Sequence, residues 1–74
     1  MEPLEFGELL MRRRPRLEAF AGWLVDDRQR VGAAIRRALA ETWRARDRLA
    51  SEPDMDRFLY AHLRSALRIQ DVRR

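Results

Sequence analysis

The chain has 74 residues, 46% of them hydrophobic, and its 16 basic residues, all arginine, outnumber 12 acidic ones for a net charge of +4. The absence of cysteine excludes a disulfide framework and a thiolate metal site, and His62 is the single histidine. No apolar run reaches membrane-spanning length and the N-terminus lacks the apolar segment of a signal peptide, so we expect one soluble, cytoplasmic domain over residues 1–74, without cofactor or metal.

The first predicted helix begins near Pro3, a residue suited to the first turn, and carries Phe6 and Leu10 on its apolar side. Pro15 removes one backbone donor and disfavours helix at the preceding residue. It therefore either kinks one long helix or separates two short ones. Helical spacing resumes with Leu17, Phe20, Ala21 and Leu24, and Trp23 lies at the edge of that stripe.

A second helix is predicted from about Asp27 to Arg48, with Asp26 or Asp27 as its N-cap. Its apolar stripe comprises Val31, Ile35, Ala38, Leu39, Thr42 and Trp43. At about 100° per residue, the opposite face carries Arg30, Arg37, Arg44 and Arg48. Glu41 is the one nearby acid spaced to pair with any of them, so this face is either solvated or binds an external anion.

The third predicted helix follows a connection that ends at Asp54, with Ser51 or Asp54 as its cap, and its apolar spacing continues to Gln70. Phe58 and Tyr60 are two residues apart and cannot both face the core, so we expect Phe58 inside and Tyr60 exposed. Together the segments predict an all-α bundle of three main helices. Its predicted core is Phe6, Leu10, Leu17, Phe20, Leu24, Val31, Ile35, Leu39, Trp43, Phe58, Leu59, Leu63 and Leu67.

Catalytic patterns are absent from the sequence. There is no Ser-His-Asp set, phosphate-binding glycine loop or carboxylate pair, and we expect His62 at the surface or its boundary. We therefore predict a binding protein and not an enzyme. The positive charge favours an anionic partner, although a GC-rich genome also favours arginine codons.

Several segments, taken in order, resemble region 2 of the extracytoplasmic-function group of sigma-70-type factors. Phe6-Gly-Glu-Leu-Leu and Arg13-Arg-Pro-Arg-Leu17 are similar to its opening segments. Its aromatic-basic segment is matched by Thr42-Trp-Arg-Ala-Arg-Asp-Arg-Leu49. Its aromatic-rich segment and closing basic run are matched by Phe58-Leu-Tyr-Ala-His-Leu-Arg-Ser65 and Asp71-Val-Arg-Arg74. Order and spacing carry the resemblance more than any single motif.

The resemblance implies a helical domain that docks on RNA polymerase and reads melted promoter DNA, by base stacking and a pocket for a flipped base. The loop 47–54 would lie where the family reads bases. Leu49 stands where an aromatic is frequent, and Ser65 where an Asn is usual. The resemblance assigns Phe58 and Tyr60 to the family's aromatic pair and Arg64 to the adjoining basic position.

The main departure from the family is the segment Arg30-Val-Gly-Ala-Ala-Ile-Arg-Arg37. The family carries acidic and Gln-Glu residues there, on a face that contacts polymerase. Reversal of the charge repels a partner adapted to carboxylates, so the resemblance does not extend to ordinary docking by this face. We also expect that a second subunit must supply the family's missing region 4.

Two main hypotheses follow. In the first, the protein acts in bacterial transcription and binds promoter DNA, polymerase or both with a second subunit. In the second, it is a sigma mimic that binds no DNA and engages an anti-sigma factor or another regulator; a helical homodimer is a third hypothesis. The candidate nucleic-acid- or partner-binding residues are Arg30, Arg37, Arg44, Arg48, Leu49, Tyr60, Arg64, Ser65 and Arg68.

Overall fold

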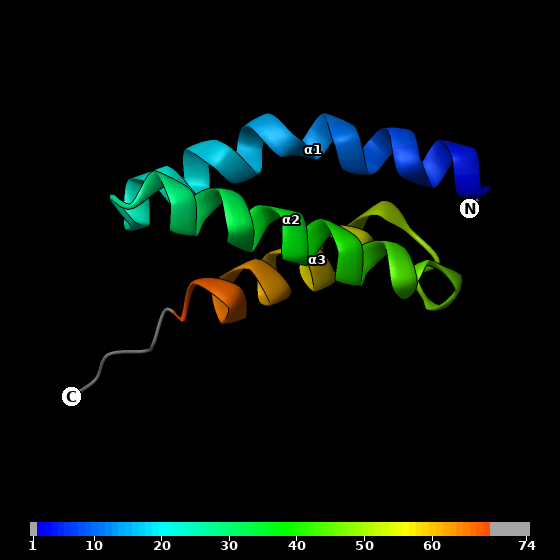
Figure 1. The fold of residues 1–74 in the computed structure, drawn as a ribbon. Helices are drawn as coiled ribbons and strands as arrows, with labels where there is room; N and C mark the ends of the chain where they lie inside the picture. The colour runs from blue at the N-terminus through cyan, green and yellow to red at the C-terminus, as the bar shows by residue number, and fades with distance from the viewer. Residues whose placement is uncertain (1, 69–74) are drawn as a thin grey trace.

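The computed structural model describes residues 2–68, which form three α-helices and no strand. In chain order these are α1 (Pro3–Leu24), α2 (Arg28–Arg44), a short 3-10 helix η1 (Arg46–Arg48) and α3 (Glu52–Leu67) (Figure 1). The predicted all-α fold with three main helices is thus confirmed. No helix in this part of the chain is long and apolar enough to cross a bilayer. The predicted extension to Gln70 and the motif 71–74 lie outside the described residues.

α1 is one continuous helix of 22 residues, although Pro15 lies inside it. Proline lacks the N–H that would bond to the carbonyl of Met11, so one bond of the helical ladder is missing. Leu10 and Leu17, on either side of this point, are 4% and 0% exposed. Burial on both sides holds the two halves in one helix, so of the two alternatives at Pro15 the split helix is wrong.

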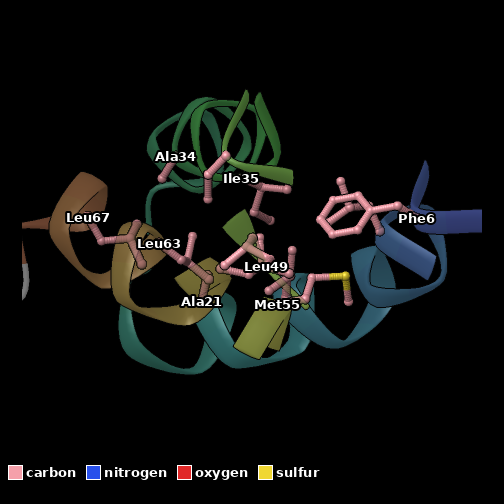
Figure 2. Packing of buried hydrophobic residues seen from close by; sticks show 13 residues of the cluster. Phe6, Ala21, Ala34, Ile35, Leu49, Met55, Leu63 and Leu67 are labelled. Carbon is pink, nitrogen blue, oxygen red and sulfur yellow. The ribbon is translucent and has the colours of Figure 1, made fainter. Parts of the chain in front are cut away.

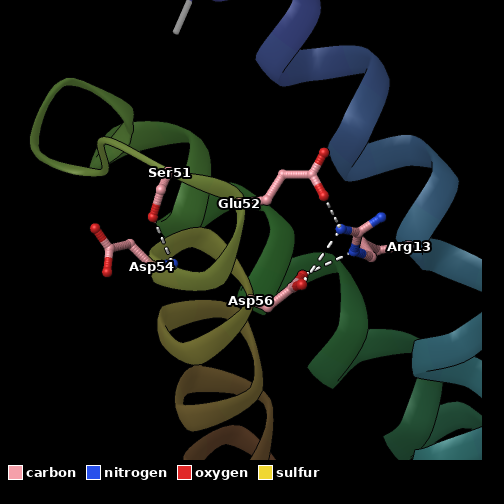
Figure 3. Close-up of polar contacts among 5 residues, drawn as sticks. All are labelled: Arg13, Ser51, Glu52, Asp54 and Asp56. Carbon is pink, nitrogen blue, oxygen red and sulfur yellow. Dashed lines mark hydrogen bonds and ion pairs between the residues drawn. The ribbon is translucent and has the colours of Figure 1, made fainter.

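Side-chain caps define where α2 and α3 begin. Asp27 Oδ1 accepts hydrogen bonds from the backbone N–H groups of Gln29 and Arg30 at 3.0 and 3.2 Å. Ser51 Oγ accepts from the N–H of Asp54 at 3.3 Å (Figure 3). Both satisfy donors that the first turn of a helix leaves unpaired. Of the alternatives predicted for each cap, the structure therefore selects Asp27 for α2 and Ser51 for α3.

One hydrophobic core lies between the three helices (Figure 2). α2 packs most extensively on α3, less on α1, and α1 touches α3 least. α2 contributes mainly small side chains to the core, and the hydroxyl of its buried Thr42 donates to the carbonyl of Ala38 at 2.8 Å. The buried apolar residues are Phe6, Leu10, Leu17, Ala21, Ala34, Ile35, Ala38, Ala45, Leu49, Met55, Leu59, Leu63 and Leu67.

Two predicted core residues are exposed. Trp43 is 37% exposed because the buried stripe of α2 is centred towards α3, which places position 43 at the stripe's edge. Leu24 is 45% exposed because α1 ends there, and the next residue, Val25, packs on the core instead. The predictions for Trp43 and Leu24 are therefore wrong.

A partly buried ion-pair cluster joins α1 to α3 (Figure 3). Arg13 Nε donates to Asp56 Oδ1 at 2.7 Å, and Nη2 donates to Asp56 Oδ2 at 3.2 Å and to Glu52 Oε1 at 3.0 Å. The hydrogen bond to Asp56 is the main reason why the pKa of Arg13 is raised. This guanidinium therefore links α1 to two carboxylates of α3 beside the apolar contacts that the two helices share.

Candidate functional site

Four of the nine candidate residues meet in a groove between α2 and the last turns of α3. Two adjoining hollows share Arg37, Ala66 and Arg68; one is also lined by Arg30 and the other by Ser65. We call these five residues the arginine groove. The side chains come from two helices, so the groove exists only in the folded protein.

The orientation of α2 explains why these arginines lie beside α3. The buried stripe of α2 includes Ala34 and leaves out Trp43, whereas the predicted stripe included Trp43. The buried side of the helix is therefore rotated towards α3 compared with the prediction. Arg30 and Arg37 lie on the helical face next to Ala34 and therefore border the α2–α3 contact. They line a groove instead of pointing away from the bundle.

Arg30 differs from the other two arginines of the groove in that its side chain has a hydrogen-bond partner within the described chain. Arg30 Nη2 donates to the carbonyl of Leu67 at 2.6 Å, where the C-terminal end of α3 leaves carbonyls unpaired and carries partial negative charge. Arg37 and Arg68 have no carboxylate within 4.0 Å among residues 2–68. Glu41 lines the same hollow but pairs with Arg44, so within residues 2–68 neither of these two guanidinium groups is held by an ion pair.

Arg68 has an unusual backbone for a residue with a side chain. It ends α3 in the left-handed conformation, with φ 60° and ψ 38°, and is the one non-glycine residue with positive φ in the described chain. Glycine is preferred at such helix ends because a Cβ atom costs about 1 kcal/mol there. Arginine at this position therefore lowers stability relative to glycine.

Three further candidates lie elsewhere. Arg44 donates to Glu41 Oε2 at 3.1 Å. Arg48 lies in η1, so it does not continue the arginine face of α2 as predicted; α2 ends four residues earlier. Arg64 is exposed on α3, one turn before Arg68. Among the described residues, the predicted row of four arginines is therefore reduced to Arg30, Arg37 and Arg44.

Two candidates for base contacts are engaged in packing. Leu49 is 9% exposed and belongs to the core, since the chain turns inward after η1. Tyr60 is half-buried and meets Phe20 edge-to-face, with ring centroids 5.2 Å apart. Leu49 is therefore unavailable for base stacking, and Tyr60 is less exposed than predicted because α1 covers one side of its ring.

A second groove, between α1 and α2, was not identified from the sequence. We call it the apolar groove, and its main lining residues are Leu4, Gly7, Met11, Leu39, Ala40 and Trp43. Leu4 and Met11 are large apolar residues outside the buried stripe of α1. Their position outside the stripe was the signal in the sequence that could have predicted an exposed apolar surface.

Comparisons of the chain with protein-family models, with curated proteins and with solved structures give no match. The two grooves and the sequence resemblance are therefore the basis on which a function is assigned.

Proposed function

We propose that this protein acts in bacterial transcription as a sigma region 2-like domain that contacts promoter DNA through the arginine groove. The observation that carries the proposal is the placing of Arg37 and Arg68 in one groove between two helices, where neither makes an ion pair among the described residues and the one lining carboxylate, Glu41, pairs with Arg44. The left-handed backbone of Arg68 supports it, since strain of this kind is often found at functional residues.

The groove suits the DNA backbone better than the bases. Guanidinium groups bind phosphate oxygens in a bidentate manner, and phosphate contacts need no aromatic platform. Base reading would need stacking residues, and Leu49 is part of the core. We therefore assign phosphate contacts to Arg37, Arg68 and the neighbouring Arg64, and sequence reading to a second subunit.

Fluorescence anisotropy with labelled single-stranded and duplex DNA tests this proposal. Affinity should fall steeply between about 50 and 200 mM salt, because each phosphate contact releases counterions. Arg37→Ala should weaken binding and reduce the slope of log Kd against log salt by about 1. Arg68→Gly should do the same while raising the free energy of unfolding by about 1 kcal/mol, since glycine suits its backbone.

A matched control removes an equal charge at another place. Arg57 lies in the first half of α3, has a 77% exposed side chain and is not part of the groove. Arg57→Ala should leave the salt slope almost unchanged. The proposal is contradicted if no DNA binds at low salt, or if Arg57→Ala weakens binding as much as Arg37→Ala.

The apolar groove favours the alternative function, a sigma mimic that binds an anti-sigma factor or another regulatory protein. Leu4 and Met11 are 72% and 58% exposed beside Trp43, and contiguous exposed apolar residues commonly mark protein contacts. Under this alternative DNA does not bind, and the chain is recognised through its α1–α2 face.

A further inference from the structure

Trp23, in the last turn of α1, has an indole ring that the fold leaves uncovered. It is 87% exposed, more than any other large hydrophobic side chain among residues 2–68. None of the ring–ring or cation–π contacts in this part of the chain involves it, whereas Trp43 packs on Phe6 and has Arg46 over its ring. The ring of Trp23 is therefore open to a flat ligand.

The backbone that carries Trp23 is fixed by its neighbours. Ala21 is 0% exposed, and Val25 packs on the core. The N–H of Val25 donates to the carbonyl of Ala21 at 2.9 Å, which closes the last turn of α1 around Trp23. Binding on this ring therefore requires no ordering of the backbone, which lowers the cost of association.

The packing of α1 on α3 places Trp23 near Arg64. The two helices run in the same direction (Figure 1), and Phe20 of α1 meets Tyr60 of α3. Trp23 follows Phe20 by three residues and Arg64 follows Tyr60 by four, so each lies one helical turn beyond this contact. Both are exposed, so an aromatic ring and a guanidinium group flank the end of the α1–α3 contact.

Arg64 connects Trp23 with the arginine groove. It lies one turn before Arg68 on α3, and Arg68 shares the groove with Arg37. Within residues 2–68 none of these three guanidinium groups has a carboxylate within 4.0 Å. A strand whose phosphates bind these arginines therefore passes round the C-terminal end of α3 towards the tryptophan.

We propose that Trp23 stacks on a base of single-stranded DNA whose phosphates bind Arg64 and the arginine groove. Stacking needs the open face of a base, which a single strand offers and a duplex keeps between its neighbouring pairs. Every base has such a face, so this contact selects single strands without reading sequence. The proposal rests on the proposed DNA contact and adds to it a preference for melted over duplex DNA.

Fluorescence titration of Trp43→Phe protein tests the stacking, because Trp23 is then the one tryptophan of the chain. We expect a thymidine oligomer of about 15 nucleotides to quench its emission at low salt. A duplex of the same length should bind without quenching. An abasic oligomer of the same length has the phosphates but no bases, and it should also bind without quenching.

Substitutions at the end of α1 separate stacking from charge. Trp23→Ala should weaken binding of the thymidine oligomer at least about fivefold and leave the affinities for duplex and abasic oligomer unchanged. Trp23→Phe keeps an aromatic face and should retain most of the affinity. Leu24→Ala is the matched control, because it removes a neighbouring 45% exposed apolar side chain that has no aromatic face, and it should leave affinity unchanged.

Four results would overturn the proposal. Trp23→Ala could leave the affinity for the thymidine oligomer unchanged, or weaken duplex equally. A uridine RNA oligomer could bind more tightly than the thymidine oligomer, which would make RNA the ligand. The free chain could sediment as a dimer that Trp23→Ala converts to a monomer, because the ring would then contact a second copy.

The outcome for Arg37→Ala distinguishes this proposal from the proposed function. If no DNA binds at low salt, both fail. If Arg37→Ala weakens DNA binding and Trp23→Ala does not, the arginine groove holds the DNA and the stacking role alone is wrong.

Discussion

At the scale of single residues, Arg13 differs from the other paired arginines in its burial. Its side chain is 12% exposed and binds carboxylates of α3, whereas Arg14 is 39% exposed and pairs within α1 with Glu18. Exposed pairs within a helix contribute little because water and salt screen them. The pair between helices adds a polar contact to the apolar packing of α1 on α3, of which the Phe20–Tyr60 contact is a part.

Arg13→Met should lower the free energy of unfolding by about 1–2 kcal/mol, because Asp56 and Glu52 lose their shared donor. Arg14→Met is the matched control and should cost less than about 0.5 kcal/mol. Urea unfolding of both variants measures the difference. An equal loss in the two variants would contradict the role given to the Arg13 cluster.

The raised pKa of Arg13 gives this contribution a defined pH dependence. Its folded pKa lies above its unfolded pKa, so the stabilisation is complete below the unfolded value and is lost only as pH rises through the folded value. Both values lie far above neutral. The difference between wild type and Arg13→Met should therefore stay constant from about pH 6 to pH 9.

Single-residue predictions succeeded where local chemistry decides the outcome and failed where neighbours decide it. Asp27 and Ser51 cap helices through bonds to N–H groups two or three residues away, which local spacing reveals. Leu49 and Tyr60 are covered by elements distant in sequence. No local signal indicated that Leu49 joins the core or that Phe20 meets Tyr60.

At the scale of elements, the start of α2 depends on a single side chain. Asp26 and Asp27 are adjacent and chemically equal, yet Asp27 accepts both bonds from the first turn. Because α2 contacts both other helices, loss of this cap affects the whole domain. The sequence indicated the two aspartates, and the structure shows that Asp27 is the cap.

Asp27→Ala should reduce the free energy of unfolding by about 1 kcal/mol, because two N–H groups lose their acceptor. Asp26→Ala removes the same charge from an exposed residue and should change it by less than about 0.5 kcal/mol. Thermal unfolding followed by circular dichroism compares the two. A larger loss in Asp26→Ala would show that the cap is wrongly assigned.

At the scale of the whole molecule, one thin core supports both grooves. Leu59 and Leu63 are 0% exposed, and they lie on the α3 face that meets α1 and α2. A chain of this size buries only about 60% of its unfolded surface, so each central leucine is a large part of total stability. The grooves lie at the α1–α2 and α2–α3 boundaries, and both depend on how α2 is oriented.

Leu63→Ala should lower the free energy of unfolding by about 2–5 kcal/mol through lost burial and a cavity. That approaches the whole stability expected for a small domain, so a large fraction of the protein should be unfolded at 37 °C. Leu4→Ala makes the same change at a 72% exposed site and should cost less than about 0.5 kcal/mol. Urea titration compares them, and similar midpoints would contradict a single central core.

The amino-acid sequence by itself determined the three helices, two of their caps and the buried faces of α1 and α3, because helical spacing and capping are local properties. Only the tertiary structure decided how α2 turns about its axis. Its apolar stripe is wide enough to allow several orientations, and close packing of its alanines on α3 selects one. That choice exposes Trp43 to the apolar groove and places Arg30 and Arg37 beside Arg68.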